Sequence, residues 1–449
     1  MTGTTGSETR RDFLELATAS AVAGSLTGIA AASAGQDLPQ KPRKRIAIIT
    51  TLWAYLRHGQ HIGDRFLVGY PWEGDWHEPE VEVVSAFVAQ RPTDADRRIR
   101  EKEFGFPQGD LAPSRAREFG FTLHKTIAGA LRCGGKQLAV DGVVIIAEHG
   151  EYPYNDKGQH LYPRAKFFAE VVDVFRRDGR AVPVFNDKHL SYSFEKARAM
   201  VATGQELGFP MLAGSSLPVT WRMPEMEVPY GARIEEALTI SSGTSLDSAG
   251  FHALEAMQCL VERRRGGETG IRRVQAIEGP AVWQALEKKR WSHELMARAL
   301  SRADLVEGIT LVDARTQDLA APGVLEKIVP KPQAVLIEYR DGLKATLLML
   351  RGAIGNYTAA VRLNENDRIL STKFLLPPEP NVAYSACLAH HIERMIVSGV
   401  ANYPVERTLL VSGLLEAAHD SRASGHRRLK TPHLDVNYRS PLASQYCRT

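Results

Sequence analysis

The 449-residue sequence has only four cysteines, and no two of them stand close enough to form a CxxC pair. A cysteine zinc site is therefore not expected. Cys259 and Cys387 lie in apolar stretches with helical patterning, which is typical of buried free thiols, although the sequence does not decide whether any of the four cysteines form a disulfide. The formal net charge of +4 is small for this length, and long basic runs are missing, so nothing indicates a nucleic-acid-binding protein.

Long hydrophobic runs are also missing, apart from a mild one at the N-terminus. Arg10 and Arg11 precede Asp12-Phe13-Leu14, and the run at 17–34 ends in Ala32-Ser33-Ala34. This pattern predicts a twin-arginine signal peptide over residues 1–34, removed after Ala34, and a linker over 35–44. The run is too weakly hydrophobic for a stable membrane anchor. The mature protein is therefore expected to be periplasmic or secreted, through the twin-arginine translocation machinery; a disordered tail is the alternative.

Strand-like and helical stretches alternate over the next part of the chain. Short β-rich runs alternate with amphipathic helical patterns, and the pattern predicts strands at 45–51, 81–88, 140–147, 181–187 and 210–216 and helices at 114–131, 166–177 and 193–207. Such alternation is typical of a doubly wound parallel sheet. We therefore expect a Rossmann-like domain over residues 45–216.

The second half has a different pattern. A helical stretch at 251–267 ends in two glycines, and four consecutive runs with strand alternation follow at 334–339, 343–351, 356–363 and 369–376. Arg340-Asp341-Gly342 between the first two runs predicts a hairpin. Helices are expected at 384–399 and 404–421. These elements predict an α+β substrate and oligomerisation domain over 217–430 with an open antiparallel sheet, a C-terminal tail over 431–449, and a homo-oligomer formed through the sheets.

Polar residues follow two of the predicted parallel strands. Glu148 and His149 come after one strand, and Asp187, Lys188 and His189 come after the next. Ligands bind at the carboxyl ends of the strands in such sheets. We therefore expect these side chains to meet in one hollow.

The order of these elements resembles the glucose–fructose oxidoreductase / inositol dehydrogenase / MocA (Gfo/Idh/MocA) family. Asp187-Lys188-His189 stands where that family has Glu-Lys-Pro, and the helix entry "LDSAGFHALEAMQCL" resembles its Asp-x-Gly-x-His pattern through Gly250 and His252. Asp247 stands one residue further back than in the family pattern. The resemblance covers about residues 44–430.

The resemblance implies an oxidoreductase that uses NAD or NADP on a sugar, polyol or related polar molecule between the two domains. In that reading, Lys188 holds the substrate hydroxyl or relays its proton, and Asp187 positions the lysine. His252 is the general base that takes the hydroxyl proton.

The sequence departs from the family where the first strand ends. The segment "IAIITTLWAYLRHGQHIGDRF" has no Gly-x-Gly-x-x-Gly turn, and Thr50, Thr51 and Trp53 add bulk where a pyrophosphate would approach. Conventional use of a nicotinamide cofactor is therefore in question. A rearranged cofactor site would involve Thr50, Thr51, Glu148 and His149.

A divalent metal (zinc, iron or manganese) is the alternative cofactor. His58 and His61 are three residues apart after the first strand and are the candidate metal ligands, with Glu148, His149, Asp187 and His189 on neighbouring strand ends. Such a site predicts a hydrolase, lyase or isomerase on the same scaffold without a dinucleotide.

A polar loop and the domain connector supply candidate substrate contacts. The region "EHGEYPYNDKGQHLYPRAKF" is rich in acids, tyrosines and histidines, which are suited to a sugar. We expect substrate contacts from Tyr152, Arg164, His189, Trp221 and Arg222. A non-catalytic periplasmic ligand-binding protein is a third functional alternative.

Overall fold

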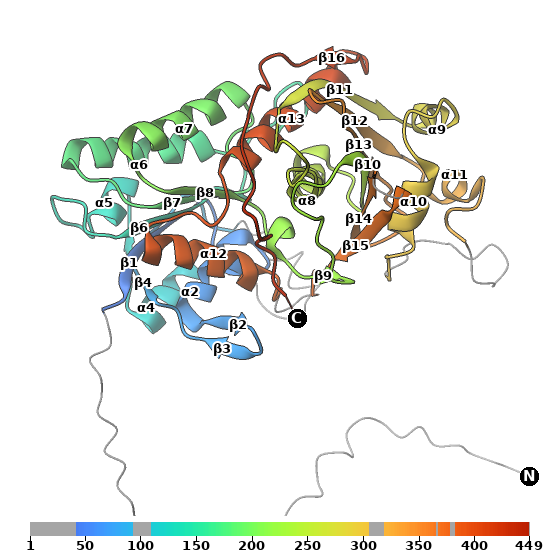
Figure 1. The fold of residues 1–449 in the computed structure, drawn as a ribbon. Helices are drawn as coiled ribbons and strands as arrows, with labels where there is room; N and C mark the ends of the chain where they lie inside the picture. The colour runs from blue at the N-terminus through green and yellow to red at the C-terminus, as the bar shows by residue number, and fades with distance from the viewer. Residues whose placement is uncertain (1–41, 93–108, 305–317, 365–366, 378–381, 449) are drawn as a thin grey trace, which may run out of the picture. The chain divides into compact units, whose positions relative to one another are not determined.

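A computed structural model describes residues 42–92, 109–304, 318–364, 367–377 and 382–448 (Figure 1). The predicted signal peptide, and all of the predicted linker except its last residues, lie outside these ranges. Within them, no helix is both long enough and apolar enough to span a membrane.

The first sheet is parallel throughout and has six strands in the order β5-β4-β1-β6-β7-β8. Its strands are β1 (Lys44–Thr50), β4 (Val81–Val88), β5 (Thr122–His124), β6 (Gly142–Ile146), β7 (Val184–Asp187) and β8 (Met211–Gly214). The direction in which strands are added reverses between β1 and β6. In doubly wound sheets this is the position of the ligand crevice.

Most of the helices predicted around this sheet are present. α6 (Arg164–Asp178) and α7 (Phe194–Leu207) agree with the sequence pattern, and Ser193 caps α7 by accepting a hydrogen bond from the Lys196 N–H. The prediction of one helix over 114–131 was wrong. Gly120 adopts φ 75° and ends α4 (Ala112–Phe119), so the chain turns into β5 before α5 (Ile127–Leu131) begins.

The segment between β1 and β4 forms a small substructure. It contains two short helices and a hairpin, namely α1 (His58–Gly63), α2 (Arg65–Val68), β2 (Tyr70–Trp72) and β3 (Asp75–His77). Trp53, in the loop before α1, is fully buried and donates a hydrogen bond from its indole N–H to Asp64 at 2.9 Å. The loop that follows β1 is therefore fixed by packing.

The second sheet has eight strands in the order β16-β11-β12-β13-β10-β14-β15-β9. Its strands are β9 (Arg222–Met223), β10 (Ile234–Ser241), β11 (Ile271–Glu278), β12 (Gln333–Tyr339), β13 (Lys344–Met349), β14 (Tyr357–Leu363), β15 (Ile369–Phe374) and β16 (Leu429–Lys430). All neighbours are antiparallel except β10 and β13, which are parallel. The four predicted strands are present, and so is the expected fold class of a Rossmann-like sheet followed by an α+β part.

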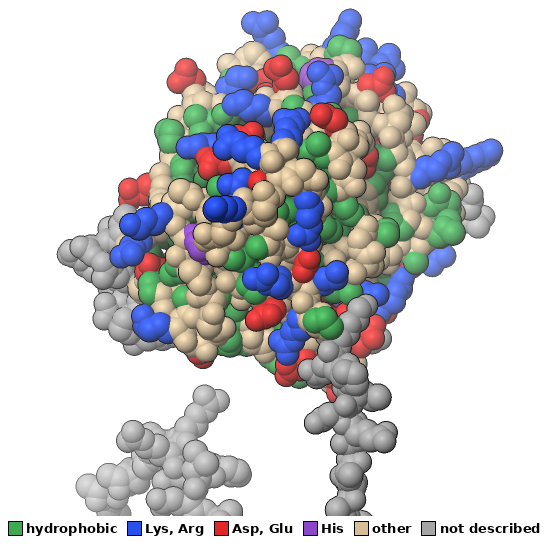
Figure 2. All heavy atoms as spheres, turned by 90° about the vertical axis from the view of Figure 1, so that its left-hand side faces the viewer, with side chains coloured by type: hydrophobic (Ala, Val, Ile, Leu, Met, Phe, Trp, Pro, Cys, Tyr) green, Lys and Arg blue, Asp and Glu red, His purple; other side chains and the backbone are tan. Residues whose placement is uncertain are grey.

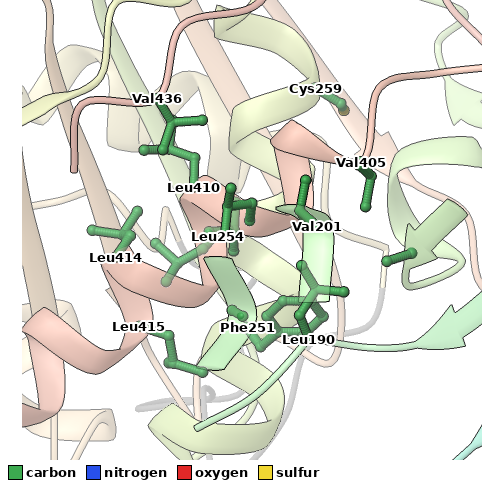
Figure 3. Packing of buried hydrophobic residues seen from close by; sticks show 14 of the residues in the cluster. Leu190, Val201, Phe251, Leu254, Cys259, Val405, Leu410, Leu414, Leu415 and Val436 are labelled. Atoms are coloured by element: carbon green, nitrogen blue, oxygen red, sulfur yellow. The ribbon is translucent and has the colours of Figure 1, made fainter. Parts of the chain in front are cut away.

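Helices pack between and around the two sheets (Figure 1). They are η1 (Leu217–Val219), the π-helical turn η2 (Leu246–Gly250), α8 (Phe251–Val261), α9 (Pro280–Glu287), α10 (His293–Leu300), α11 (Val324–Ile328), α12 (Ser385–Ser398) and α13 (Glu406–Ala423). Figure 3 shows Leu254 of α8 beside Leu410 and Leu414 of α13, with Val201 of α7 nearby. α13 therefore joins the helical layer of the first sheet to that of the second.

Helix α12 covers the other face of the first sheet, although it follows the strands of the second sheet in the chain. Its Ile392 and Met395 share a core with Ile46 and Val144. Cys387 of α12 forms a disulfide with Cys447, which fixes the C-terminal tail to this helix. The expectation of a free thiol at Cys387 was therefore wrong, whereas Cys259 is a buried thiol.

The surface carries charges of both signs. On the face shown in Figure 2, lysine and arginine side chains are spread widely and acidic side chains lie among them. This distribution agrees with the small net charge of the sequence.

Candidate functional site

Three adjacent strands of the first sheet end beside one another. β1, β6 and β7 are parallel neighbours, so the residues that follow them emerge at the same edge. Two of these residues have a left-handed backbone, namely His149 with φ 71° and Lys188 with φ 58°. Such conformations cost about 1–3 kcal/mol and cluster at functional sites. The strained positions therefore mark this edge of the sheet.

A buried ion-pair network lies under this edge. Glu148 accepts hydrogen bonds from Lys188, at 2.8 Å, and from Arg164. All three side chains are at most 5% exposed. Burial alone would raise the pKa of Glu148, but the Lys188 and Arg164 cations outweigh it and hold that pKa well below its usual value. Glu148 is therefore an ionised anchor between two cations.

Asp187 and His58 form a hydrogen-bonded pair at the same edge. Nδ1 of His58, in α1, lies 2.7 Å from Oδ2 of Asp187, at the end of β7. A carboxylate only accepts hydrogen bonds, so the His58 ring donates its Nδ1–H and keeps Nε2 as its acceptor. This arrangement is that of an imidazole oriented by a carboxylate, as in many general bases.

Three more histidines surround this pair. The ring centroids of His149, His61 and His252 lie 5.0, 5.9 and 6.4 Å from that of His58. Burial above all keeps the pKa values of His149 and His252 well below the usual value, and the charge of Lys188 acts in the same direction on both. Both rings are therefore neutral near pH 7. We refer to His58, His61, His149 and His252 as the histidine cluster.

A cavity of about 150 Å³ opens onto the cluster between the two sheets. Its walls are formed by His58, His61, Ile62, Asp187, Ser216, Leu217, His252, Tyr357, Leu376, Tyr384 and Ser385. Oδ1 of Asp187 and Nδ1 of His252, in two of the wall residues, are covered by protein and have no hydrogen-bond partner among the described residues. The wall itself includes histidine, serine and tyrosine side chains, which suit a polar ligand.

The predicted site residues divide into three groups. Those brought together at this edge are His58, His61, Glu148, His149, Asp187, Lys188 and His252. Arg164 and His189 also lie here, 3.1 Å apart between Nη1 and Nε2, but they are buried behind the cavity. Burial, followed by the Arg164 charge, lowers the pKa of His189 to about 3.

The remaining predicted contacts lie elsewhere. Trp221 lines a separate groove with Trp72 and His390. Arg222 is buried, stacks over Tyr446 at 4.0 Å and donates to the Met226 carbonyl. Tyr152 packs against another tyrosine of its own loop, Tyr162. The structure does not bring these three predicted residues into the cavity.

The π-helical turn explains the displaced aspartate of the "LDSAGFH" segment. η2 fits an extra residue before α8, and Asp247 turns away to accept a hydrogen bond from the His160 N–H at 3.1 Å. Ser248 takes the position beside Lys188, with Oγ 3.2 Å from Nζ. The aspartate therefore does not face the cavity.

Sequence reasoning missed several wall residues. Tyr357 is the first residue of β14, Tyr384 is the N-cap residue of α12, and Ser385 follows it; Ser216, by contrast, lies in the domain connector, from which contacts in the cleft were expected. These residues come from distant segments that only the fold brings together, and no motif marks them. Tyrosines at the predicted starts of a strand and a helix were the only available signal.

The predicted metal site finds no support in the geometry. Over the described ranges, no group of three or more histidine, cysteine, aspartate or glutamate side chains is arranged to hold a metal ion. His58 instead uses Nδ1 for Asp187.

The strand ends also do not form the usual dinucleotide site. A pyrophosphate normally binds backbone N–H groups at a glycine turn and helix start after the first strand. Here the His58 N–H at the start of α1 points to Nδ1 of His149 at 3.4 Å. The hydroxyls of Thr50 and Thr51 donate to the carbonyls of Ile146 and Glu148, at 3.0 and 2.7 Å. The groups expected to hold a pyrophosphate are therefore engaged with the protein itself.

The crevice beside β1 is bridged as well. The side-chain amide of Gln90, which follows β4, donates to the Glu151 carbonyl at 3.0 Å and accepts from the Glu151 N–H at 2.8 Å. The two bonds join the segments that follow β4 and β6 across the end of β1. The residues present therefore do not fit a dinucleotide bound in the usual way.

The sequence matches no protein-family model and no curated protein. Among solved structures, GenD2 from gentamicin A biosynthesis, in complex with NAD, is similar at a TM-score of 0.51 with 15% identity, over 87% of this chain and 97% of that one. Myo-inositol dehydrogenase from Lactobacillus casei, in complex with NAD(H) and myo-inositol, is similar at 0.49 with 11% identity, over 86% and 96%. Myo-inositol 2-dehydrogenase from Lactobacillus plantarum is similar at 0.48 with 12% identity, over 86% and 99%. The likeness to GenD2 shows a shared two-part fold.

Proposed function

We propose that this protein is an enzyme that acts on a small polyhydroxylated molecule, such as a sugar, a polyol or a derivative, in the cavity at the histidine cluster. The observation that carries this proposal is the His58–Asp187 pair on the cavity wall, opposite a neutral His252. A cavity of similar volume holds a molecule of about the size of benzene. The substrate is therefore a single ring or a short open chain.

The residues around the cavity have distinct roles in this proposal. Asp187 orients His58, which exchanges a proton with the substrate. His252 offers a neutral ring nitrogen to a substrate oxygen, and Tyr357 and Tyr384 close the walls. Lys188 holds the strand end in place through Glu148 and adds positive potential from behind the wall.

A thermal-shift panel of sugars, polyols and sugar acids tests this function. A ligand at 100 times its dissociation constant raises the free energy of unfolding by about 2.7 kcal/mol, which a melting curve detects. We expect at least one member to stabilise the wild type and to lose most of that effect in His252→Ala. His293→Ala, which changes an exposed histidine that is not among the wall residues of the cavity, is the matched control. Equal stabilisation of wild type and His252→Ala would contradict the proposal.

Oxidation with NAD or NADP is the second candidate, because GenD2 shares the fold and was solved with NAD. Titration with NADH, followed by its fluorescence, tests this candidate. Saturable binding at micromolar concentration would favour oxidation with a dinucleotide. We expect no saturable binding, because the hydroxyls of Thr50 and Thr51 and the N–H of His58 already contact other groups of the protein.

Export through the twin-arginine pathway is a further proposal. It rests on Arg10 and Arg11 and on Ala32-Ser33-Ala34, and the Cys387–Cys447 disulfide is typical of an oxidising compartment. Mass spectrometry of the periplasmic fraction tests it, with a mature N-terminus at Gly35 as the expected result. The homo-oligomer expected from the sequence is also a proposal, and light scattering of the purified protein tests it.

A further inference from the structure

We infer that the Asp187–His58 pair is the general base of a redox-neutral reaction, in which a proton is taken from a carbon next to a carbonyl and returned to the substrate. This inference rests on the proposed function and deepens it. It names the reaction as an isomerisation or epimerisation of a hydroxy-carbonyl compound. It needs neither a dinucleotide nor a metal.

The first support is the way in which the chain places His58. α1 crosses close to the loop that leaves β1, so a Cβ atom on Gly59 would lie 2.3 Å from the Leu52 carbonyl oxygen. Trp53, buried in the same loop, donates to Asp64, and Arg115 also donates to Asp64 at 3.1 Å. These contacts fix α1, so His58 is presented to the cavity by a rigid support. Preorganisation of this kind is what a proton-transfer group requires.

The second support is the way in which Asp187 is held. It ends β7 within the sheet, and Lys188, which follows it, has a left-handed backbone pinned by the hydrogen bond from its N–H to the Gly214 carbonyl at 3.0 Å. The Lys188 ammonium turns away from Asp187 to Glu148. Among the described residues, the hydrogen-bond partner of the Asp187 carboxylate is therefore the imidazole of His58. The carboxylate stabilises the positive charge that His58 acquires when it takes a proton.

The third support is the engagement of the strand ends. In a dehydrogenase that uses a dinucleotide, the oxidised cofactor accepts the electrons. Here the His58 N–H at the helix start after β1 contacts His149, and the Gln90–Glu151 bridge spans the crevice beside β1. The His58–Asp187 pair and the cavity wall are made by this chain alone. A reaction that moves only protons is therefore consistent with the residues present.

The chemical step balances within the substrate and His58. The C–H bond breaks, its proton forms an N–H bond at Nε2 of His58, and the electron pair of the C–H bond moves to the carbonyl oxygen to give an enediolate. The neutral ring of His252, which lines the cavity, stabilises that oxygen by a hydrogen bond from its ring N–H. For isomerisation, His58 returns the proton to the former carbonyl carbon, and the hydroxyl proton of the enediolate passes to the former carbonyl oxygen, so the carbonyl re-forms on the neighbouring carbon. For epimerisation, the enediolate turns over in the cavity before His58 returns the proton to the opposite face of the same carbon. No electrons leave the substrate.

Deuterium exchange tests this inference. The folded protein is incubated in D₂O, without added cofactor, with a panel of small aldoses, ketoses and hydroxyketones, and the loss of the C–H signal next to the carbonyl is followed by proton NMR. Binding of the same panel is measured by calorimetry. We expect exchange with the wild type and at least about 100-fold slower exchange with His58→Gln and with Asp187→Asn, since general-base catalysis contributes about 10²–10⁴-fold.

The variants are chosen so that folding and chemistry can be separated. Asp187→Asn keeps an oxygen that accepts the His58 Nδ1–H and removes only the charge, and His293→Gln, an exposed histidine, is the matched control with unchanged exchange. If His58→Gln melts at a lower temperature than the wild type, the exchange rate of Asp187→Asn alone tests the general-base inference.

The outcomes distinguish failure of the general-base inference from failure of the proposed function. Ligand binding with no exchange in the wild type, or full exchange in Asp187→Asn, overturns the general-base inference and leaves the proposed function standing. Failure of every panel member to bind overturns both.

Discussion

Nδ1 of His58 lies 2.7 Å from Oδ2 of Asp187, although 129 residues separate them in the chain. The distance depends on the close packing of α1 against the loop after β1, where Gly59 has no room for a side chain. Gly59→Ala should therefore displace α1 and lower stability by about 1–3 kcal/mol, as overpacking does. Urea unfolding measures the loss.

Gly109→Ala is the matched control for that experiment. A Cβ atom there meets no atom of the described part of the chain within 4 Å. We expect its stability to stay within about 0.5 kcal/mol of the wild type. Equal stability of the two variants would show that the approach of α1 to the loop does not constrain His58.

Glu148→Gln should be strongly destabilising. The substitution leaves the buried cations of Lys188 and Arg164 without their shared anion. Breaking a buried ion pair in this way costs about 3–5 kcal/mol. Glu294→Gln, which removes an exposed carboxylate paired with Arg362 at 2.8 Å, should cost less than about 1 kcal/mol. A smaller loss for Glu148→Gln than for Glu294→Gln, in denaturant unfolding, would refute the role of Glu148 as an anchor.

Reduction should destabilise the protein through Cys387 and Cys447. Their disulfide closes a loop with a sequence separation of 60, for which the chain-entropy model gives about 4 kcal/mol. We expect a lower melting temperature in the presence of a reductant and in Cys387→Ser. The control is Cys133→Ser, which removes a thiol outside the disulfide. An unchanged melting temperature on reduction would mean that the disulfide does not form in solution.

Stability should fall in acid because buried histidines stay neutral in the fold. Burial, more than any other cause, lowers the pKa of His391 to about 4 from an ordinary value of 6.5. Between these two values the unfolded state binds more protons, so the free energy of unfolding decreases as the pH falls from 6.5 towards 4. The slope is at most about 1.4 kcal/mol per pH unit for this residue.

His391→Asn isolates that contribution. The variant has no titrating group at this position, so its unfolding free energy should depend less steeply on pH between 6.5 and 4. Denaturant unfolding at a series of pH values gives both slopes. Parallel pH profiles for wild type and variant would contradict the assignment.

The sequence predicted the strand ends well because buried parallel strands are continuous apolar runs, and the residues after them are forced to one edge. It missed β10 and β11, since "RIEEALTIS" and "IRRVQAIE" interrupt the apolar pattern with charges. It also gave no sign that α12 returns to the first sheet, because an apolar helix face does not reveal its partner.

His58 was expected at the site, but as a metal ligand. Two histidines three apart suggest a shared ligand, whereas the partner of His58 is Asp187, and only the fold brings these two together.

A double-mutant cycle on turnover tests the central claim most directly. The ratio kcat/KM is measured for wild type, His58→Gln, Asp187→Asn and the variant with both changes, with the substrate that the exchange experiment identifies. If the two residues act as one general base, the double variant is about as impaired as His58→Gln alone, because groups that act as a unit are not additive. Losses that multiply in the double variant would show that His58 and Asp187 act independently, and would contradict the account.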